Sequence, residues 1–94
     1  MATEFEFDPE KSKINAQKHG VDFIKAQEIW QGPYAEFAAL SEYENRYAAV
    51  GKIGKNIYTC IFCLRKDNIR LISCRRARKG EVTLYEKTIK KTNK

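Results

Sequence analysis

Short apolar runs rich in β-branched and aromatic residues fill the chain between residues 34 and 76. Polar turn residues separate these runs, and this pattern is typical of strands joined by tight turns. The expected strands cover residues 34–40, 46–53, 56–65 and 69–75. Gaps this short favour antiparallel hairpins, because parallel strands need a crossover of a dozen or more residues.

The N-terminal part of the chain carries the punctuation of a helix. Residues 5–7 alternate in polarity as a short first strand does. Asp8 then suits the N-cap of a helix, and Pro9 suits its first position. Gly20 suits the left-handed residue that follows a helix C-terminus. We therefore expect a helix between Asp8 and Gly20.

Two further helices follow from apolar residues spaced three and seven positions apart. The first is capped by Asp22 and ends before Pro33, and its apolar face is Phe23, Ala26 and Trp30. The second follows Gly80, and its thin apolar stripe is Val82, Tyr85 and Ile89. The order β-α-α-β-β-β-β-α describes one domain over residues 1–94. The simplest packing is an α+β fold, a small antiparallel sheet with helices on one face.

The charge is concentrated at the C-terminal end. Residues 1–64 hold seven basic and nine acidic residues, whereas residues 65–94 hold eleven basic and three acidic ones. Such a basic end attracts nucleic acid, an acidic protein or an anionic membrane surface, and it also serves as a solvated face. The acidic start is unlike a signal peptide, and no apolar run reaches the roughly 20 residues that span a bilayer. We expect a cytoplasmic protein that does not enter membranes.

The three cysteines do not predict a disulfide framework or a metal site. Cys60 and Cys63 have the spacing of a ligand pair, but they fall within an expected strand. Residues three apart in a strand point to opposite faces, so the two thiols do not share one metal. Buried, reduced cysteines are the preferred interpretation. The expected hairpin register places Cys60 opposite Cys74.

Two polar clusters are candidates for chemistry. Asn15, Lys18 and His19 share a helix face, where His19 suits proton transfer or phosphate contact. The structural alternative is that Lys18 and His19 complement the dipole at the helix C-terminus. Glu44 and Arg46 share a strand face, either as a surface ion pair or as a base beside a phosphate-binding arginine.

The third cluster is the run Ile72–Gly80, "ISCRRARKG". Strand alternation separates Arg75 from Arg76, and Arg78 and Lys79 lie at the start of the last helix. Arginine binds phosphate in a bidentate manner and stays charged at neutral pH. Cations at a helix N-terminus oppose the helix dipole, so this run is locally unfavourable. A locally unfavourable choice favours a functional role over a solvated rim.

The chain resembles the BrnT toxins of bacterial type II toxin–antitoxin systems, which are small ribonucleases with a RelE-like fold. The matching segments are "FEFDPEKSKINAQKHGVDFIKA", "ENRYAAVGKI", "IFCLR" and "IRLISCRRARKGEVTLYE". Two departures are Cys74, where the family usually has alanine, and Gly80, where it usually has a charged residue.

The resemblance implies an endoribonuclease toxin that inhibits translation, without metal or other cofactor. A BrnA-type antitoxin would neutralise it, bind DNA and repress the operon as a complex, with a toxin dimer in a two-to-two assembly. The implied catalytic residues are Arg75, Arg76, Glu44, Arg46, Arg65 and His19. The implied RNA-binding residues are Lys18, Arg78, Lys79 and Tyr85.

The expected hairpin register places some of the implied catalytic residues far from others. If Arg65 faces Ile69 and Thr59 faces Arg75, the two arginines lie about 20 Å apart on one face, at ~3.3 Å per residue. The residues then form either two separate sites or one site reunited by a bulge or by long side chains that reach across from a helix. Two other functions remain open: a basic binding module that does not cleave RNA, and an inactive relative that acts with an antitoxin in operon repression.

Overall fold

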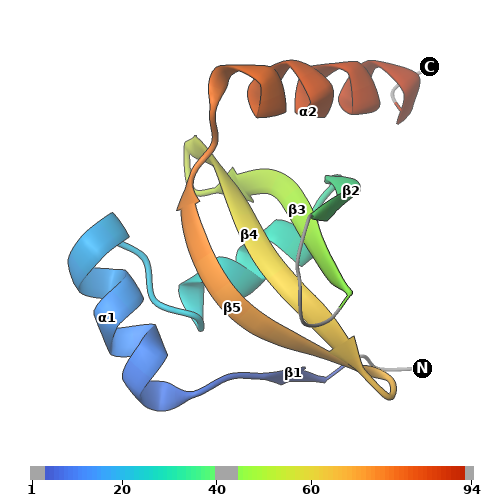
Figure 1. Ribbon diagram of the computed structural model, residues 1–94. Coiled ribbons are helices and arrows are strands. Elements are labelled where there is room, and N and C mark those ends of the chain that lie inside the picture. The colour runs from blue at the N-terminus through green and yellow to red at the C-terminus, as the bar shows by residue number, and fades with distance from the viewer. Residues whose placement is uncertain (1–3, 40–44, 93–94) are drawn as a thin grey trace.

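One five-stranded sheet forms the centre of the protein. The computed structural model describes residues 4–39 and 45–92, and Figure 1 shows the strands in the order β1-β5-β4-β3-β2. The strands are β1 Phe5–Glu6, β2 Ala35–Ala39, β3 Arg46–Ile53, β4 Asn56–Arg65 and β5 Asn68–Arg76. The α+β class and the four-strand antiparallel meander are confirmed.

The prediction of a wholly antiparallel sheet is wrong at one edge. β1 pairs with β5 in parallel, with Phe5 opposite Ile69. Most of the chain separates the two strands, so no hairpin constrains their direction. The backbone N–H of Ile69 also donates to the carbonyl of Glu4 at 2.9 Å. The sheet is therefore mixed.

The first helix begins and ends as predicted. In α1, Pro9–His19, the Asp8 carboxylate accepts a hydrogen bond from the backbone N–H of Glu10 at 2.9 Å. Gly20 has φ 77°, and its N–H donates to the carbonyl of Ala16 at 2.9 Å. These contacts satisfy backbone groups that would otherwise lack partners at the helix ends.

The second helix is a 3-10 helix, η1, Lys25–Gln31, and not the predicted α-helix. The Asp22 carboxylate caps it, accepting from the backbone N–H groups of Ile24 and Lys25 at 3.0 and 2.8 Å. In a 3-10 helix, residues three apart eclipse one another. Ala26 and Ile29 therefore both point into the sheet, where they are 0% and 1% exposed.

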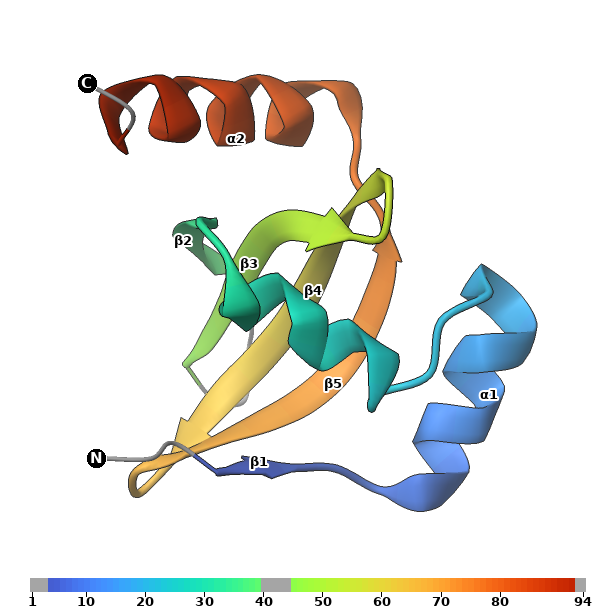
Figure 2. The same ribbon diagram turned by 180° about the vertical axis from the view of Figure 1, so that it is seen from behind.

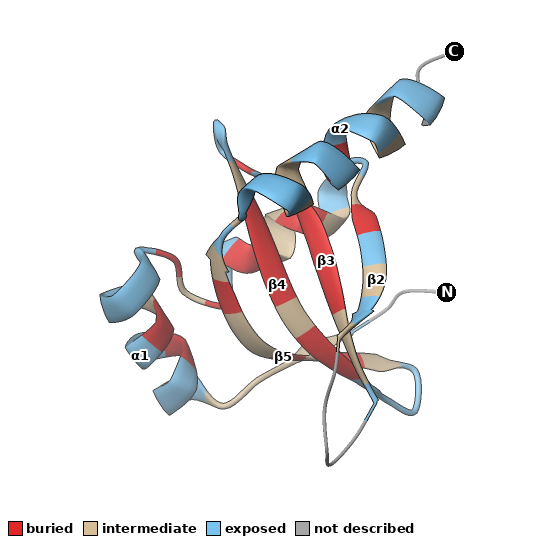
Figure 3. Cartoon of the chain, turned by 45° about the horizontal axis from the view of Figure 1, so that its top comes forward, coloured by how far each residue is buried: buried red, intermediate tan, exposed pale blue. Residues whose placement is uncertain are grey.

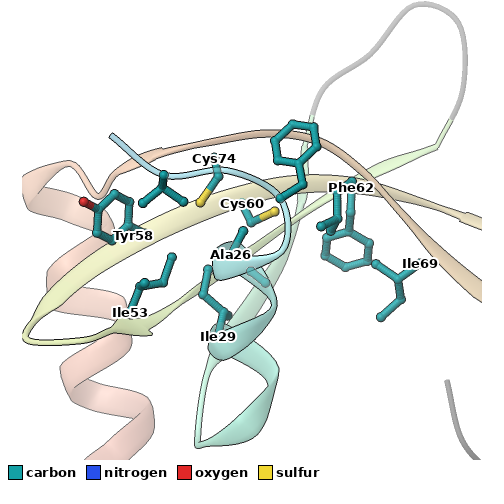
Figure 4. Packing of buried hydrophobic residues seen from close by; sticks show 12 residues of the cluster. Ala26, Ile29, Ile53, Tyr58, Cys60, Phe62, Ile69 and Cys74 are labelled. Atoms are coloured by element: carbon teal, nitrogen blue, oxygen red, sulfur yellow. The ribbon is translucent and has the colours of Figure 1, made fainter. Parts of the chain in front are cut away.

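In Figure 2, η1 crosses one face of the sheet, and the larger core lies between them. Ala26 and Ile29 meet the strands there, and the side chains of Cys60 and Cys74 lie side by side (Figure 4). All three cysteines are free and buried. Two effects raise the pKa of the Cys60 thiol well above its usual range: a hydrogen bond with Cys74, which is the larger effect, and burial. The expected pairing of Cys60 with Cys74 is confirmed.

The C-terminal helix α2, Lys79–Thr92, covers the opposite face at one end of the sheet (Figure 3). Tyr85 is 4% exposed and packs against Ala35 and Val50. Both faces of β3 are apolar here, because Ala49 belongs to the η1 core and Val50 to this smaller one. The prediction of helices on one face is therefore wrong. No helix of the described residues is long and apolar enough to span a membrane.

The first helix packs against the free edge of β5, beyond the short pairing with β1 (Figures 1 and 2). The buried amide of Asn15 accepts from the backbone N–H of Cys74 at 3.0 Å and donates to its carbonyl at 2.8 Å. The same amide nitrogen donates to the carbonyl of Val21 at 2.7 Å. Nearby, the Ser12 hydroxyl accepts from the N–H of Phe23 at 2.9 Å. Side chains of α1 thus take the place of a neighbouring strand.

We expect Asn15→Ala to lower the free energy of unfolding by about 3 kcal/mol, because it leaves three buried backbone groups without their partner. Urea unfolding at neutral pH measures this change. The control is Gln17→Ala at an exposed position of the same helix, which should change it by less than about 0.5 kcal/mol. Equal losses in the two variants would contradict the role given to the Asn15 amide.

Candidate functional site

The turn between β4 and β5 is one residue shorter than predicted. Arg65 pairs with Asn68 and not with Ile69, and Lys66 adopts a left-handed conformation with φ 58°. This shift places Arg70 opposite Cys63. It therefore decides which β5 side chains share a face with Arg65.

A bulge in β5 compensates for the shorter turn. It lies at Ile72, because the pairs on either side of it are Ile61–Ser73 and Phe62–Leu71. Beyond the bulge, the register returns to the predicted one, with Thr59 opposite Arg75. Arg65 and Arg75 remain about 20 Å apart along the sheet, since six residues of β4 separate Arg65 from Thr59.

Arginines gather on the half of the sheet face that α2 leaves open. Cys63 pairs with Arg46 on one side and Arg70 on the other, so these two arginines flank β4 about 10 Å apart. Arg65 lies two residues further along β4, on the same face. A polar pocket of about 170 Å³ opens among them. We call it the arginine pocket, and its lining is Asp8, Lys11, Arg46, Arg65, Arg70, Leu71 and Ile72.

Basic residues outnumber acidic ones among the described residues of this pocket. One carboxylate oxygen of Glu6 lies 3.3 Å from a guanidinium nitrogen of Arg70. The other accepts a hydrogen bond from the Asn68 amide at 3.1 Å. The hydrogen bond from Asn68, with help from Arg70 and Arg65, lowers the pKa of Glu6. Among the described residues of the lining, Asp8 is the single acidic one, against four basic ones. The pocket therefore suits an anion such as a phosphate.

A second hollow continues from the arginine pocket along α1. It has a volume of about 330 Å³. We call it the helix groove, and its lining is Lys11, Ile14, Asn15, Lys18, His19, Ile72 and Ser73. Lys11 and Ile72 line both hollows. The predicted grouping of Asn15, Lys18 and His19 is present, but the amide of Asn15 is buried and holds the backbone.

At the opposite end of the face, Arg75 is bound to Glu81 in a two-pronged ion pair. The nitrogen–oxygen distances are 2.8 and 2.9 Å. Glu81 also accepts from the Thr59 hydroxyl and from the backbone N–H of Arg78, each at 2.8 Å. These partners, with Arg75 the strongest, lower the pKa of Glu81 to about 2. The carboxylate at the start of α2 thus offsets the basic residues there.

The remaining predicted residues are dispersed. The Arg76 guanidinium lies 5.7 Å from the centre of the Tyr58 ring, and Arg78 and Lys79 are exposed at the start of α2. Tyr85 faces the sheet from α2 and is 4% exposed, so it offers little surface to RNA, and desolvation raises its pKa. Glu44 lies outside the described residues. Within the described ranges, no group of three or more histidine, cysteine or acidic residues is placed to hold a metal ion.

Sequence reasoning left Lys11 and Arg70 out of the site. Arg70 lies between Ile69 and Leu71, which both face the larger core, so its side chain had to face the other way. The turn length then decides that it stands beside Arg46 and Arg65. Lys11 was visible as a basic residue one turn before Asn15, but only the docking of α1 on β5 brings it to the pocket.

Comparisons with known proteins give matches in sequence and in fold. A family model described as the ribonuclease toxin BrnT of type II toxin–antitoxin systems matches residues 7–81. Among solved structures, the chain is similar to the ribonuclease toxin BrnT of Brucella abortus, with a TM-score of 0.62 and 25% identity. That match covers 83% of this chain and 100% of the Brucella chain. Comparison with curated protein sequences gave no significant match.

We expect Glu81→Gln to lower the free energy of unfolding at pH 7 by up to about 3 kcal/mol. The folded carboxyl has a pKa of about 2, below its ordinary 4.5. Its stabilisation is therefore complete above about pH 4.5 and is lost as the pH falls toward 2. Urea unfolding at pH 7 and about pH 3 measures the difference from the parent, which should shrink at the lower pH.

The matched control for this experiment is Glu86→Gln, at an exposed position of α2. It should show little difference from the parent at either pH. A difference between Glu81→Gln and the parent that stays constant with pH would contradict the assignment of the ion pair.

Proposed function

Because this chain belongs to the BrnT family of ribonuclease toxins from type II toxin–antitoxin systems, we propose that it cleaves RNA at the arginine pocket. The observation that supports this site is the convergence of Arg46, Arg65 and Arg70 with Lys11 on one polar hollow. The family implies an RNA target and an antitoxin partner. The assignment of the pocket and the steps below are our proposal.

The reaction proposed is attack of a ribose 2′-oxygen on the adjacent phosphorus, with departure of the 5′-oxygen of the next nucleotide. Negative charge builds up on the non-bridging phosphate oxygens as the five-coordinate state forms. Arginines already fixed around the phosphate stabilise that charge more than the ground state, which lowers the barrier. Arg46 and Arg70 flank the pocket from neighbouring strands, and Arg65 closes it from the turn.

Two proton transfers accompany the attack. A base accepts the 2′-hydroxyl proton, and an acid donates a proton to the departing 5′-oxygen. Among the described residues, His19 is the first candidate for the base. Its imidazole lines the helix groove, which shares Lys11 with the arginine pocket. Glu44 precedes Arg46 by two residues and is the second candidate for the base. Lys18 binds the RNA backbone beside His19.

Arg75 has a different role in this proposal. Its guanidinium is occupied by Glu81, and it lies about 20 Å from Arg65 along the sheet. We assign it to the attachment of α2 and not to the phosphate. Arg76, Arg78 and Lys79 then provide positive charge at a distance from the reaction, which attracts RNA without reading its sequence.

The predicted antitoxin completes the proposed biology. We propose a BrnA-type protein that binds this chain in the cytoplasm, blocks cleavage and represses the operon through its own DNA-binding part. A toxin dimer in a two-to-two complex is part of this proposal. Support comes from the type II family, in which the antitoxin is a protein.

We expect cleavage to persist in EDTA, because the arginines supply the positive charge that a metal ion would otherwise bring to the phosphate. The measurement is the cleavage rate of a fluorescent single-stranded RNA with and without the chelator. Loss of activity in EDTA, with recovery on adding Mg²⁺, would contradict the metal-independent mechanism.

We expect Arg65→Ala to lower the cleavage rate at saturating RNA by about 100-fold, as removal of one fixed charge stabiliser does. Arg75→Ala should mainly lower stability, through loss of the ion pair with Glu81. Single-turnover cleavage and urea unfolding of both variants separate the two effects. The control is Lys55→Ala in the β3–β4 turn, far from the pocket.

Two outcomes would contradict this proposal, the first in its site and the second in its function. If folded Arg75→Ala loses cleavage while Arg65→Ala keeps it, the catalytic site lies at the α2 end of the sheet. If the parent binds RNA but neither cleaves it nor arrests growth when expressed alone, the chain is a binding module or an inactive relative.

A further inference from the structure

The helix groove contains an exposed apolar side chain in basic surroundings. Ile14 is 47% exposed on α1, and Ile72, the bulged residue of β5, lines the groove beside it. Isolated exposed apolar residues are common and need no explanation. Here, however, two isoleucines from different elements line one hollow, whose exposed surface is mainly apolar.

Basic residues stand on either side of Ile14 along the helix. Lys11, Ile14 and Lys18 are spaced at i, i+3 and i+7, so they form one stripe about 10 Å long at ~1.5 Å per residue. His19 lines the same hollow at the end of this stripe. The arrangement is an apolar floor with cations at both ends, which matches a flat base attached to a charged backbone.

The helix groove adjoins the arginine pocket. Lys11 and Ile72 belong to both linings. A strand of RNA with one phosphate among the arginines would therefore place a neighbouring nucleotide over Ile14. The volume of about 330 Å³ is at the lower end of the range of small-molecule sites, about 300–1,000 Å³.

We propose that the helix groove binds one unpaired base of single-stranded RNA, next to the phosphate in the arginine pocket. This inference rests on the function proposed above. Ile14 and Ile72 contact the face of the base, and Lys11 and Lys18 contact its flanking phosphates. Single-stranded RNA offers such bases, whereas in a duplex the base faces are stacked and out of reach.

The charge and shape of the groove favour RNA over a protein segment. An apolar peptide would bury Ile14 but would leave Lys11 and Lys18 without anionic partners. A nucleotide satisfies both features, because every base has an apolar face and every linkage has a negative charge. The bulge at Ile72 contributes directly, since it turns an apolar residue of an edge strand toward α1.

The test measures binding of a fluorescein-labelled single-stranded RNA of about 12 nucleotides, within the range of single-stranded binding sites. Its 2′-oxygens are methylated so that it is not cleaved. We expect Ile14→Ser to weaken binding about fivefold to tenfold, and Ile14→Phe to strengthen it, because an aromatic ring is a better stacking surface. Neither variant should change binding of a duplex of the same sequence.

Salt dependence separates the base contact from the phosphate contacts. Lys18→Ala should weaken binding and reduce the slope of log affinity against log salt by about 0.7, as loss of one phosphate contact does on single strands. Ile14→Ser should leave this slope unchanged. Both parameters come from fluorescence anisotropy titrations at several salt concentrations.

Matched controls are available in the chain. Ile24 is 69% exposed and does not line the groove, so Ile24→Ser removes an equivalent side chain elsewhere. Lys13, on another face of α1, is the control for Lys18. Thermal unfolding of each variant checks that the fold is intact. We expect it to be, because Ile14 and Ile24 are both exposed.

The outcomes distinguish this inference from the proposed function. If Ile14→Ser and Ile24→Ser bind the single strand equally well, the base site is wrong, even when Arg65→Ala still abolishes cleavage. If Ile14→Ser weakens duplex binding as much as single-strand binding, the groove contacts the backbone and not a base. If the parent does not cleave RNA but Ile14→Phe gains affinity for the single strand alone, the base site stands and the proposed reaction fails.

Discussion

The relation between the first helix and the sheet depends on the buried amide of Asn15. An edge strand exposes backbone N–H and carbonyl groups, and leaving them without partners in a buried place is costly. The amide supplies one donor and one acceptor to Cys74, and its second donor ties the chain segment after α1 to the same point. Because α1 is held here, the neighbouring residues of the same helix face, Lys11, Lys18 and His19, border the sheet.

The arginines on the sheet face opposite η1 form two groups, one at the α2 end and one beside the β4–β5 turn. At the α2 end, Arg75 meets a carboxylate that is 15% exposed, and the pair is completed by hydrogen bonds from Thr59 and the α2 backbone. At the other end, Arg46, Arg65 and Arg70 line a pocket in which the described basic residues outnumber the acidic ones, although Arg70 also pairs with Glu6. Compensated charge holds an element in place, whereas excess charge in a hollow attracts an anion.

This division changes how the basic segment at residues 65–94 is interpreted. In the sequence its arginines look like one patch, and the resemblance to BrnT toxins assigned several of them to one reaction. In the structure they separate into a group beside the β4–β5 turn, an ion pair under α2 and exposed residues at the start of α2. Our proposals for RNA cleavage and base binding use the first group with α1, and they leave α2 as a structural element.

Local patterns were sufficient for much of this fold. Asp8, Pro9 and Gly20 determined the limits of α1 through backbone hydrogen bonding within a few residues. The polar turns likewise predicted the three hairpin connections of the sheet, and two strands, residues 46–53 and 56–65, have the predicted limits. These features depend on residues that are close together in the chain, so they can be predicted from the sequence alone.

The features that the sequence did not determine depend on contacts between distant segments. The parallel pairing of β1, the docking of α2 on the second face and the 3-10 form of η1 each result from packing against the sheet. The turn is one residue shorter than predicted and the bulge at Ile72 adds one residue, so the predicted pairing of Thr59 with Arg75 holds although the partner of Arg65 was predicted one residue too late. Alternation along a strand assigns a face to each arginine, but only the assembled sheet decided which arginines share a pocket and which one meets Glu81.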